Sequence, residues 1–332
     1  MGEFGLIKHL TKEIEPCHES TRKGVGDDCA VIGTDTENCT LITTDLLMEG
    51  VHFDLTYMPM RHLGYKAVMV NLSDVYAMNG TPQQITISLA ISKRFKVEDI
   101  EELYAGMRLA CEQHKVDIVG GDTTASMNGL VITISATGRA KKSEVAYRSG
   151  AKEHDLICIT SNLGAAYMGL HLLEREKRVL KDIENPEPKF AGHEYLLERY
   201  LKPRARQNVL KALAEQGIRP TSMIDLSDGL ASDLRQICLA SQCGARIYLD
   251  RIPIAKQTTQ LAEEMHVDPV VAALNGGNDY QLMFTVPLAM QEQVMRLGLV
   301  DVVGHITRES TGAYLVTPDG SDIKLRAQGF KE

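Results

Sequence analysis

Six short aspartate-bearing motifs are spread over most of this 332-residue chain. Most of them directly follow an apolar run, at the point where a buried element reaches the surface. Aspartates at the ends of elements can converge in the fold, and converging carboxylates repel one another unless a cation lies between them. Hard divalent cations take oxygen ligands, so the pattern predicts a Mg²⁺ site that holds phosphate groups. The motifs are Gly26-Asp27-Asp28, Thr43-Thr44-Asp45, Asn71-Leu72-Ser73-Asp74, Gly120-Gly121-Asp122, Asp225-Leu226-Ser227-Asp228 and Gly276-Gly277-Asn278-Asp279.

The charge balance limits the class of partner. The chain has 36 lysines and arginines against 44 aspartates and glutamates, which gives a net charge of −8 at pH 7. An acidic chain without a basic block argues against a nucleic acid or an anionic membrane as the partner. Tryptophan is absent and aromatic residues make up 5% of the chain, so platforms for stacking single-stranded bases are not expected. A phosphorylated ligand would need metal ions to offset repulsion from this protein.

The cysteines indicate a reducing compartment. There are seven, an odd number, with no C-x-x-C pair, and several lie within apolar runs, as Cys158 does. Buried, reduced thiols of a cytosolic protein fit this usage better than a disulfide framework. The first residues carry no basic-then-apolar signal, and no run reaches transmembrane length. We therefore expect a cytoplasmic protein with neither a membrane nor a nucleic-acid partner.

Hydrophobic periodicity predicts an α/β chain whose first half is of the α+β type. Apolar residues alternate over residues 84–91 and 130–136, which is typical of half-buried strands in an antiparallel or mixed sheet. Apolar residues at helical spacing predict helices over residues 97–114 and 62–78. Asp74 is therefore expected to project from a helix rather than from a loop.

The pattern turns polar around residues 141–144, and a new strand begins near residue 155. We place a domain boundary there, with an N-terminal domain at residues 1–140 and a C-terminal α/β domain at residues 148–332. Residues 174–193 are charged and include two prolines, which predicts an exposed loop between helices in the middle of this segment. In the second half we expect strands at residues 155–160, 245–249, 281–286 and 299–305, and helices at residues 204–216 and 229–241.

Each aspartate motif, taken alone, has an ordinary structural interpretation. Residues 24–28 fit a polar turn at least as well as a loop that approaches a phosphate and ends in a metal ligand. Residues 43–45 follow an apolar strand and offer two hydroxyls and a carboxylate, which are oxygens that Mg²⁺ binds. A strand that ends in an N-capping aspartate would have the same sequence, so these residues alone leave both interpretations open.

The later motifs are equally ambiguous one by one. Residues 120–122 follow an apolar strand, so their N–H groups could meet an anion at its end or form a tight turn. Ser227 or Asp228 could be a helix N-cap, and a single histidine such as His52 is more often structural than catalytic. Together, however, the six motifs supply more unpaired carboxylate than an ordinary core tolerates. The chain has no P-loop and no kinase H-R-D or D-F-G set, so any use of ATP requires another architecture.

The order of these motifs resembles that of the thiamine-monophosphate kinase family, within the aminoimidazole-ribonucleotide-synthetase-like ATP-binding superfamily. The similarity covers nearly the whole chain, and the T-D-x-L-x-E-G-x-H-F pattern that ends at Phe53 is similar to the kinase branch rather than to the synthetase branch. The matching segments are residues 24–28, 43–53, 64–78, 119–124, 148–151, 224–230 and 276–285.

The resemblance implies ATP-dependent phosphorylation of thiamine monophosphate to thiamine diphosphate, by direct in-line γ-phosphoryl transfer with several Mg²⁺ ions. Such transfer needs mainly positioning and charge neutralisation, which ions between aspartates and phosphates provide. By this resemblance the metal ligands are Asp28, Thr43, Thr44, Asp45, Asp74, Asp122, Asp225 and Asp228. The implied ATP contacts are Tyr104, Gly121, Asp122, Arg148 and Ser227, and the implied contacts to thiamine monophosphate are His52, Asn278 and Phe330.

Two features depart from the family pattern. The family's G-G-E-D-Y-E-L is here Gly-Gly-Asn-Asp-Tyr-Gln-Leu, so Asn278 and Gln281 replace two glutamates. The first of these glutamates is a substrate contact in the family, and Asn278 can still form hydrogen bonds there but offers no charge. The chain also lacks the usual His-Phe after the aromatic residue at position 330.

The resemblance further implies a two-domain, synthetase-like fold. Its N-terminal mixed sheet with helices would form a strand-rich interface in a homodimer, and the C-terminal domain would contribute Asp225, Ser227 and Asp228. Two alternatives remain open. One is another ATP-dependent synthetase of the superfamily, although a selenophosphate synthetase would have a reactive cysteine in a glycine-rich context, which Cys17 is not in. The other is a non-catalytic Mg-nucleotide binding protein, which only the changes at Asn278 and Gln281 favour.

Overall fold

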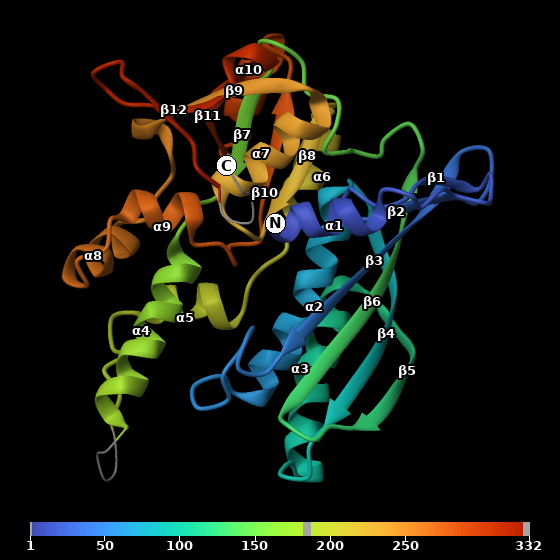
Figure 1. The fold of residues 1–332 in the computed structure, drawn as a ribbon, viewed down its shortest axis with the longest axis vertical. Helices are drawn as coiled ribbons and strands as arrows, with labels where there is room; N and C mark the ends of the chain where they lie inside the picture. The colour runs from blue at the N-terminus through green and yellow to red at the C-terminus, as the bar shows by residue number, and fades with distance from the viewer. Residues whose placement is uncertain (1, 182–186, 328–332) are drawn as a thin grey trace.

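The computed structural model describes residues 2–181 and 187–327, which form two mixed sheets, one in each half of the chain (Figure 1). The N-terminal sheet has six strands in the order β1-β2-β3-β6-β4-β5. All its neighbours are antiparallel except β4 and β5, which are parallel, so the expected mixed sheet is confirmed. Its strands are β1 (Thr21–Lys23), β2 (Ala30–Gly33), β3 (Asn38–Met48), β4 (Thr81–Ile91), β5 (Asp117–Ala125) and β6 (Leu130–Lys141).

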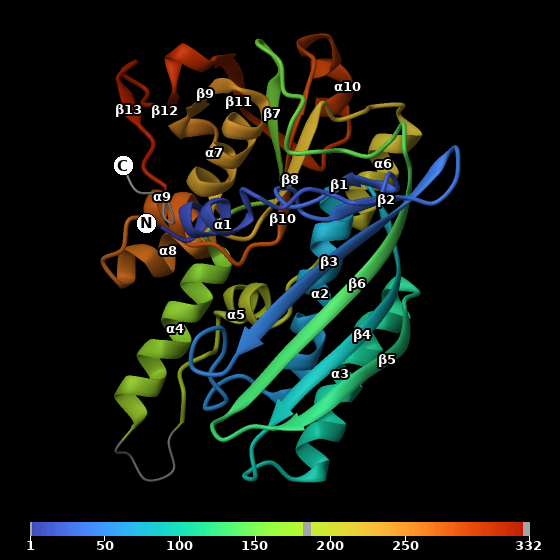
Figure 2. The same cartoon turned by 45° about the vertical axis from the view of Figure 1, so that its right-hand side comes forward.

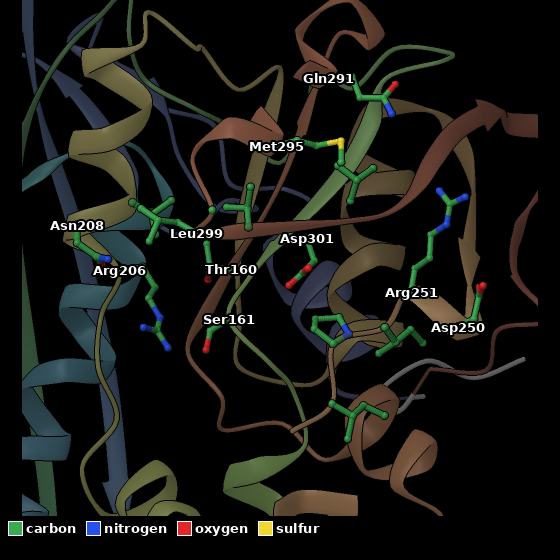
Figure 3. A pocket seen from close by; sticks show the side chains of 17 residues that line it. Thr160, Ser161, Arg206, Asn208, Asp250, Arg251, Gln291, Met295, Leu299 and Asp301 are labelled. Carbon is green, nitrogen blue, oxygen red and sulfur yellow. The ribbon is translucent and has the colours of Figure 1, made fainter. Parts of the chain in front are cut away.

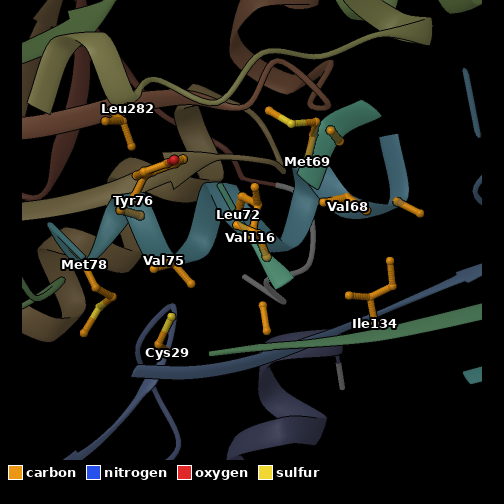
Figure 4. Packing of buried hydrophobic residues seen from close by; sticks show 14 of the residues in the cluster. Cys29, Val68, Met69, Leu72, Val75, Tyr76, Met78, Val116, Ile134 and Leu282 are labelled. Carbon is orange, nitrogen blue, oxygen red and sulfur yellow. The ribbon is translucent and has the colours of Figure 1, made fainter. Parts of the chain in front are cut away.

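Alternating burial divides this sheet into a core face and an open face. Along β6, Leu130, Ile132, Ile134 and Ala136 are buried, and the residues between them are partly exposed. The buried side chains pack beneath α2 (Met60–Ala77) and α3 (Val97–His114), and Figure 4 shows Ile134 of the sheet below Val68, Leu72 and Val75 of α2. The two expected strands and both expected helices are therefore confirmed, and the sheet presents one face without helices.

Two glycines allow α2 and α3 to approach closely. A Cβ atom on Gly64 would lie 1.9 Å from the carbonyl oxygen of Leu103, and one on Gly106 would lie 1.9 Å from that of Arg61. A contact that short cannot exist, so any side chain here would push the helices apart. The close crossing fixes α2, which carries Asp74, against the sheet.

We expect Gly64→Ala to lower the free energy of unfolding by about 3 kcal/mol, because the added methyl group overpacks a helix crossing. The matched control is Gly24→Ala, where an added Cβ would have no atom within 4 Å and the backbone is unstrained. Chemical denaturation of both variants measures the difference. Equal stability of the two would show that the helices can separate without cost.

The C-terminal sheet has seven strands in the order β13-β12-β9-β11-β7-β10-β8. Its neighbours are antiparallel except β9 and β12. The strands β7, β8 and β10 are buried along their whole length, since helices cover both faces of this part. The strands are β7 (Leu156–Thr160), β8 (Ser222–Leu226), β9 (Cys243–Tyr248), β10 (Gln281–Val286), β11 (Val300–Arg308), β12 (Ala313–Val316) and β13 (Asp322–Lys324).

Of the remaining helices, α7 packs against the second sheet, whereas α4 and α5 extend away from it beside the N-terminal half, and α1 lies beside the C-terminal half in both views (Figures 1 and 2). No helix in the described part of the chain is long and apolar enough to cross a bilayer. The helices are α1 (Glu3–Thr11), α4 (Ala165–Leu180), α5 (Glu194–Leu201), α6 (Gln207–Glu215), α7 (Leu230–Ser241), α8 (Lys256–Glu264), α9 (Pro269–Asn275) and α10 (Gln291–Arg296), with short 3-10 turns at Leu249–Arg251, Leu288–Met290 and Glu309–Thr311.

The expected elements of the second half are confirmed, with shifts at some boundaries. Strand β10 and helix α7 match closely, whereas the expected helix at residues 204–216 begins only at Gln207. In the segment 174–193, the helix α4 continues to Leu180, and the described residues 187–190 have no regular structure. Two expectations were wrong: residues 43–45 and 120–122 lie inside β3 and β5 rather than at strand ends.

Candidate functional site

Three carboxylates from distant parts of the chain converge between the two sheets. Asp28 lies in the loop between β1 and β2, Asp74 on α2, and Asp225 on β8, so both halves of the molecule contribute. One oxygen of each lies within 4.8 Å of the others. Asp28 and Asp225 are buried, and Asp74 is partly buried. Carboxylates this close together and removed from water repel one another strongly and need a counter-charge. The expected convergence of the motifs is therefore confirmed for these three residues.

Hydrogen bonds from neighbouring hydroxyls orient the cluster. Thr43 Oγ1 donates to Asp74 Oδ2 at 2.5 Å, and Ser73 Oγ donates to Asp225 Oδ2 at 2.6 Å. The second bond crosses from α2 to β8 and therefore ties the two halves of the chain together at the cluster. Asp45 is held near these residues by its backbone, because its N–H donates to the side-chain oxygen of Asn71 on α2 at 3.1 Å.

Arg148 holds one side of the cluster. Its guanidinium pairs with Asp28 Oδ1, and its backbone N–H donates to Asp27 Oδ1 at 3.0 Å. The second oxygen of Asp28 is buried and has no hydrogen-bond partner among the described residues. A buried carboxylate oxygen without a donor is expensive, and a cation at that point would satisfy it.

The pKa values of the cluster are all shifted upward. Burial raises the pKa of Asp28 to about 6 even though Arg148 acts against the shift, and burial raises that of Asp45 to about 6 as well. Burial, followed by the charge of Asp28, raises the pKa of Asp225 to about 8. Burial and the neighbouring carboxylates raise the pKa of Asp74 well above its usual value. Four carboxyl groups that resist ionisation in the metal-free protein are ready to bind a cation, because the cation supplies the charge that would let them ionise.

Two loops of the C-terminal half interlock beside the cluster. The backbone N–H of Asn278 donates to the Ser227 carbonyl at 2.8 Å, and that of Tyr280 donates to the Leu226 carbonyl at 2.9 Å. The N-cap of α7 is Gly229, with φ 111°, and neither Ser227 nor Asp228 caps the helix with its side chain. The capping interpretation of these two residues is therefore wrong, and their side chains remain available to a ligand.

Several predicted site residues lie away from the cluster in the single chain. Asp122 is on β5, which is separated from β3 by β6 and β4, at about 14 Å for three strand spacings. Its carboxylate accepts only the N–H of Thr123 among the described residues, at 2.8 Å. Thr44 points to the opposite face of β3 from Thr43 and donates to the Ile134 carbonyl at 3.2 Å. Tyr104 lies partly buried on α3, in the packing of the N-terminal core.

Gly121 has a structural reason for being glycine. A Cβ atom there would lie 1.8 Å from the carbonyl oxygen of Ile87 on the paired strand β4. The expectation that residues 120–122 follow a strand end, where they would meet an anion or form a tight turn, is thus corrected, because pairing with β4 keeps the backbone extended through both glycines. A Cβ atom on Gly120, by contrast, would make an ordinary contact, 4.0 Å from Cγ2 of Thr86.

The residues predicted to touch the substrate surround a buried lysine. Lys66 of α2 is 2% exposed, its Nζ donates to Asn278 Oδ1 at 3.2 Å, and it lies 4.0 Å from the ring centre of Tyr200. No carboxylate among the described residues forms an ion pair with it. Burial lowers the pKa of Lys66 to about 7. The side chain of His52 accepts the Met48 N–H at 3.0 Å, and burial followed by the charge of Lys66 lowers its pKa, so it is neutral at pH 7. The predicted Phe330 lies outside the described residues.

We expect Asn278→Glu to raise the free energy of unfolding at pH 7 by about 2 kcal/mol, because the new carboxylate pairs with a buried lysine. The pKa of Lys66 is lower in the folded than in the unfolded protein, so the folded protein binds fewer protons between pH 7 and about 10.5. This group therefore makes the protein less stable as the pH falls from 10.5 to 7. Chemical denaturation at pH 7 and pH 9.5 should show a smaller difference in Asn278→Glu and in Lys66→Met than in the natural chain. An unchanged pH dependence in both variants would contradict this account.

Two residues of the site were not singled out from the sequence. Lys66 gave no clear signal, because its helix also contains Arg61, His62 and Asp74, so a lysine there resembles a surface residue. Tyr280 gave none either, because an aspartate-tyrosine pair after two glycines resembles a turn. Tyr280 is buried, and burial followed by the charges of the nearby aspartates raises the pKa of its hydroxyl group well above the usual value.

Comparison with known proteins agrees with this geometry. The family of AIR synthase related proteins matches in both parts, its N-terminal domain at residues 26–140 and its C-terminal domain at residues 152–316. Thiamine-monophosphate kinase of Buchnera aphidicola subsp. Schizaphis graminum is 34% identical, over 99% of this chain and 98% of the relative. Thiamine-monophosphate kinase of Escherichia coli K12 is 33% identical, over 99% of this chain and 97% of the relative.

A solved structure agrees as well. The structure of AaThiL complexed with AMPPCP and TMP superposes with a TM-score of 0.83 at 30% identity, and covers 98% of this chain and 96% of the other. The likeness therefore extends over both sheets and over the loop, helix and strand that carry Asp28, Asp74 and Asp225. With relatives at this identity over their full length, the chain belongs to the thiamine-monophosphate kinase family.

Proposed function

We propose that this protein transfers the γ-phosphoryl group of ATP directly and in line to thiamine monophosphate, giving thiamine diphosphate. The observation that carries the proposal is the convergence of Asp28, Asp74 and Asp225 from both halves of the chain. Two polyphosphate anions must meet in this reaction, and an acidic protein repels both of them. A carboxylate cluster that holds cations between them removes this obstacle.

The donor set fits Mg²⁺. It consists of carboxylate and hydroxyl oxygens without nitrogen or sulfur, and the buried Asp28 Oδ2 has no other partner among the described residues. When bound, Mg²⁺ would neutralise the charge of the phosphates and of the transferred group. The residues proposed to hold the ions are Asp28, Thr43, Thr44, Asp45, Asp74, Asp122, Asp225 and Asp228.

The chain's own residues would position both substrates. Arg148 extends its guanidinium along the cluster and would hold a phosphate there, and Ser227 would bind the nucleotide from the interlocked loops. Asn278 and His52 would contact the acceptor, and Lys66, whose Nζ hydrogen-bonds only Asn278 among the described residues, would offer its other N–H donors there. Gly121, Asp122 and Tyr104 are proposed nucleotide contacts, and Phe330 a contact to the thiamine rings.

We further propose that the protein acts as a homodimer that brings Asp122 to the cluster. Every residue of β5 is exposed, although this edge strand includes Ile118 and Val119. On the opposite side of the sheet, β3 pairs with β2 only up to Ile42, so its residues 43–48 have one free edge among the described strands. Pairing of β5 from one copy with this edge of the other would cover both and set the partner's aspartate beside Asp45.

The remaining assignments follow from the same proposal. The two sheets support domains at residues 1–140 and 148–332, with the cluster between them. The acidic charge and the six cysteines buried as free thiols support a cytoplasmic protein that binds no nucleic acid.

The test is a turnover assay with the full-length protein, Mg²⁺, ATP and thiamine monophosphate, in which thiamine diphosphate is separated and quantified. We expect product and ADP in equal amounts, and no product in EDTA. Binding of ATP without product at saturating Mg²⁺ would instead identify a non-catalytic nucleotide-binding protein. ADP release without thiamine diphosphate would indicate a different acceptor.

A further inference from the structure

A cavity of about 1060 Å³ lies in the C-terminal half, away from the aspartate cluster. The end of β7, the N-terminal turn of α6 and the segment from Gly298 to Val302 form its walls. None of the described residues predicted to bind metal, nucleotide or substrate lines it. Figure 3 shows Arg206 and Ser161 on one side and Asp250 and Arg251 on the other. The cavity is large enough for a ligand of nucleotide size.

Arg206 forms no ion pair with a carboxylate among the described residues, although the charge of Asp279, which pairs with Arg199, also acts on it. The Nε of Arg206 donates to the neutral Gln281 Oε1. The adjacent arginines are already paired, Arg199 with Asp279 and Arg204 with Glu198. Burial, and repulsion from these two arginines, lower the pKa of Arg206 to about 10, so it remains charged at pH 7. An anion in the cavity would pair with this charge.

The position of Arg206 is fixed by a saturated hydrogen-bond network. Gln281 is fully buried, and its Oε1 also accepts the Thr160 hydroxyl at 3.0 Å. Its Nε2 donates to the Asp279 carbonyl at 2.9 Å. Both polar atoms of the Gln281 side chain are thus engaged. The guanidinium N–H groups of Arg206 other than that on Nε have no hydrogen-bond partner among the described residues. They are therefore preorganised donors at the wall of the cavity.

Two further groups add donors at the same wall. Ser161 has φ 54°, a left-handed conformation that is strained for serine, and no described residue hydrogen-bonds its hydroxyl. The helix α6 begins directly after Arg206 without a side-chain cap, and its residue Asn208 lines the cavity. Uncapped N–H groups at a helix N-terminus favour anions. Arg206 and Ser161 also line an adjoining cavity of about 260 Å³, where Lys202 lies beside the two ion pairs Arg199–Asp279 and Arg204–Glu198.

Apolar side chains also line the cavity, together with the carboxyl groups of Asp250 and Asp301. The apolar residues are Val209, Ile254, Met295 and Leu299, and Met295 and Leu299 are exposed in the free chain. We propose that this cavity binds an organic phosphate, with the phosphate group against Arg206 and Ser161 and the organic ring against these apolar side chains. The proposal is independent of the reaction at the aspartate cluster and adds a second ligand site to the protein.

The test is calorimetric titration of the full-length protein in EDTA with pyrophosphate, thiamine diphosphate and ADP as separate probes. EDTA removes the divalent cations that would bridge phosphates to the aspartate cluster, and the variants below assign the remaining binding to the cavity or to the cluster. We expect pyrophosphate to bind, and at least one organic phosphate to bind more tightly than pyrophosphate. Whichever of thiamine diphosphate and ADP binds more tightly shows whether the natural ligand of the cavity is a thiamine phosphate or a nucleotide. No binding of any probe, or no gain from either organic group, would overturn the proposal.

Three variants locate the binding. Arg206→Gln should weaken all probes by about tenfold or more, because the charge-assisted contact is lost. Leu299→Trp should weaken only the organic phosphates, and since Leu299 is partly exposed this change leaves the core intact. Asp74→Asn should leave binding unchanged. Equal affinity in Arg206→Gln with a normal unfolding transition would contradict the site, as would loss of binding in Asp74→Asn. These outcomes are independent of turnover, so they are distinct from a failure of the kinase proposal.

Discussion

Replacing Asp74 by asparagine should reduce turnover by on the order of a thousandfold while making the metal-free protein more stable. Asparagine keeps the shape of the side chain and can still accept the hydrogen bond from Thr43. It also removes the repulsion between Asp74 and the carboxylates of Asp28 and Asp225, whose oxygens lie within 4.8 Å. The free energy of unfolding in EDTA should therefore rise by about 1 kcal/mol or more. Added Mg²⁺ should raise the Tm of the natural chain more than that of the variant.

Asp268→Asn is the matched control for this change. Asp268 caps α9 by accepting the Val270 N–H at 2.8 Å, and asparagine caps a helix as well as aspartate does. The same chemical replacement should therefore alter neither turnover nor stability. If Asp74→Asn retained activity, or lost it only because the protein unfolded, the cluster would not be the metal site.

A mixed dimer of two inactive variants should regain about a quarter of the natural activity. In the proposed homodimer each site combines Asp74 of one copy with Asp122 of the other. Asp74→Asn and Asp122→Asn are each expected to inactivate both sites of their own dimers. When the two chains are co-expressed, half of the dimers are mixed, and each mixed dimer has one site with both aspartates intact.

The alternative arrangement gives the opposite result. If Asp122 served the site of its own chain, every site in a mixed dimer would lack one aspartate, and co-expression would restore nothing. The distance of about 14 Å between β3 and β5 within one chain favours restoration. Val119→Lys, which places a charge on the exposed edge of β5, should give inactive monomers in sedimentation analysis. Val97→Lys, at an exposed position on α3, is its control and should remain dimeric.

Elements with clear periodicity could be predicted from the sequence. The helix over residues 97–114 and the strand over residues 281–286 have the expected bounds, because the helix has apolar residues at helical spacing and the strand is a short, mostly apolar run. The convergence of Asp28, Asp74 and Asp225 was expected from their positions beside apolar runs and is found. Membership of the family could be inferred from the order of the motifs along the chain.

Other features depend on tertiary contacts that leave no local signal. Glycine and aspartate are depleted in strands, so residues 120–122 resemble a turn, yet parallel pairing with β4 keeps them extended. The same reason applies to residues 43–45, where eleven pairs with β6 carry β3 through to Met48. Lys66 resembles a surface residue until the packing of α2 shows it to be buried. The opposite orientations of Thr43 and Thr44 follow from strand alternation, which becomes visible once β3 is known to continue.

The stereochemistry of the transferred phosphorus tests the central claim most directly. ATP made chiral at the γ-phosphorus with oxygen isotopes would be turned over with thiamine monophosphate and Mg²⁺, and the configuration of the thiamine diphosphate analysed. Direct in-line transfer across the carboxylate cluster predicts inversion, since a single displacement occurs. Retention of configuration would mean two displacements through a covalent phosphoenzyme, and would contradict the account of a site that works by positioning and charge neutralisation alone.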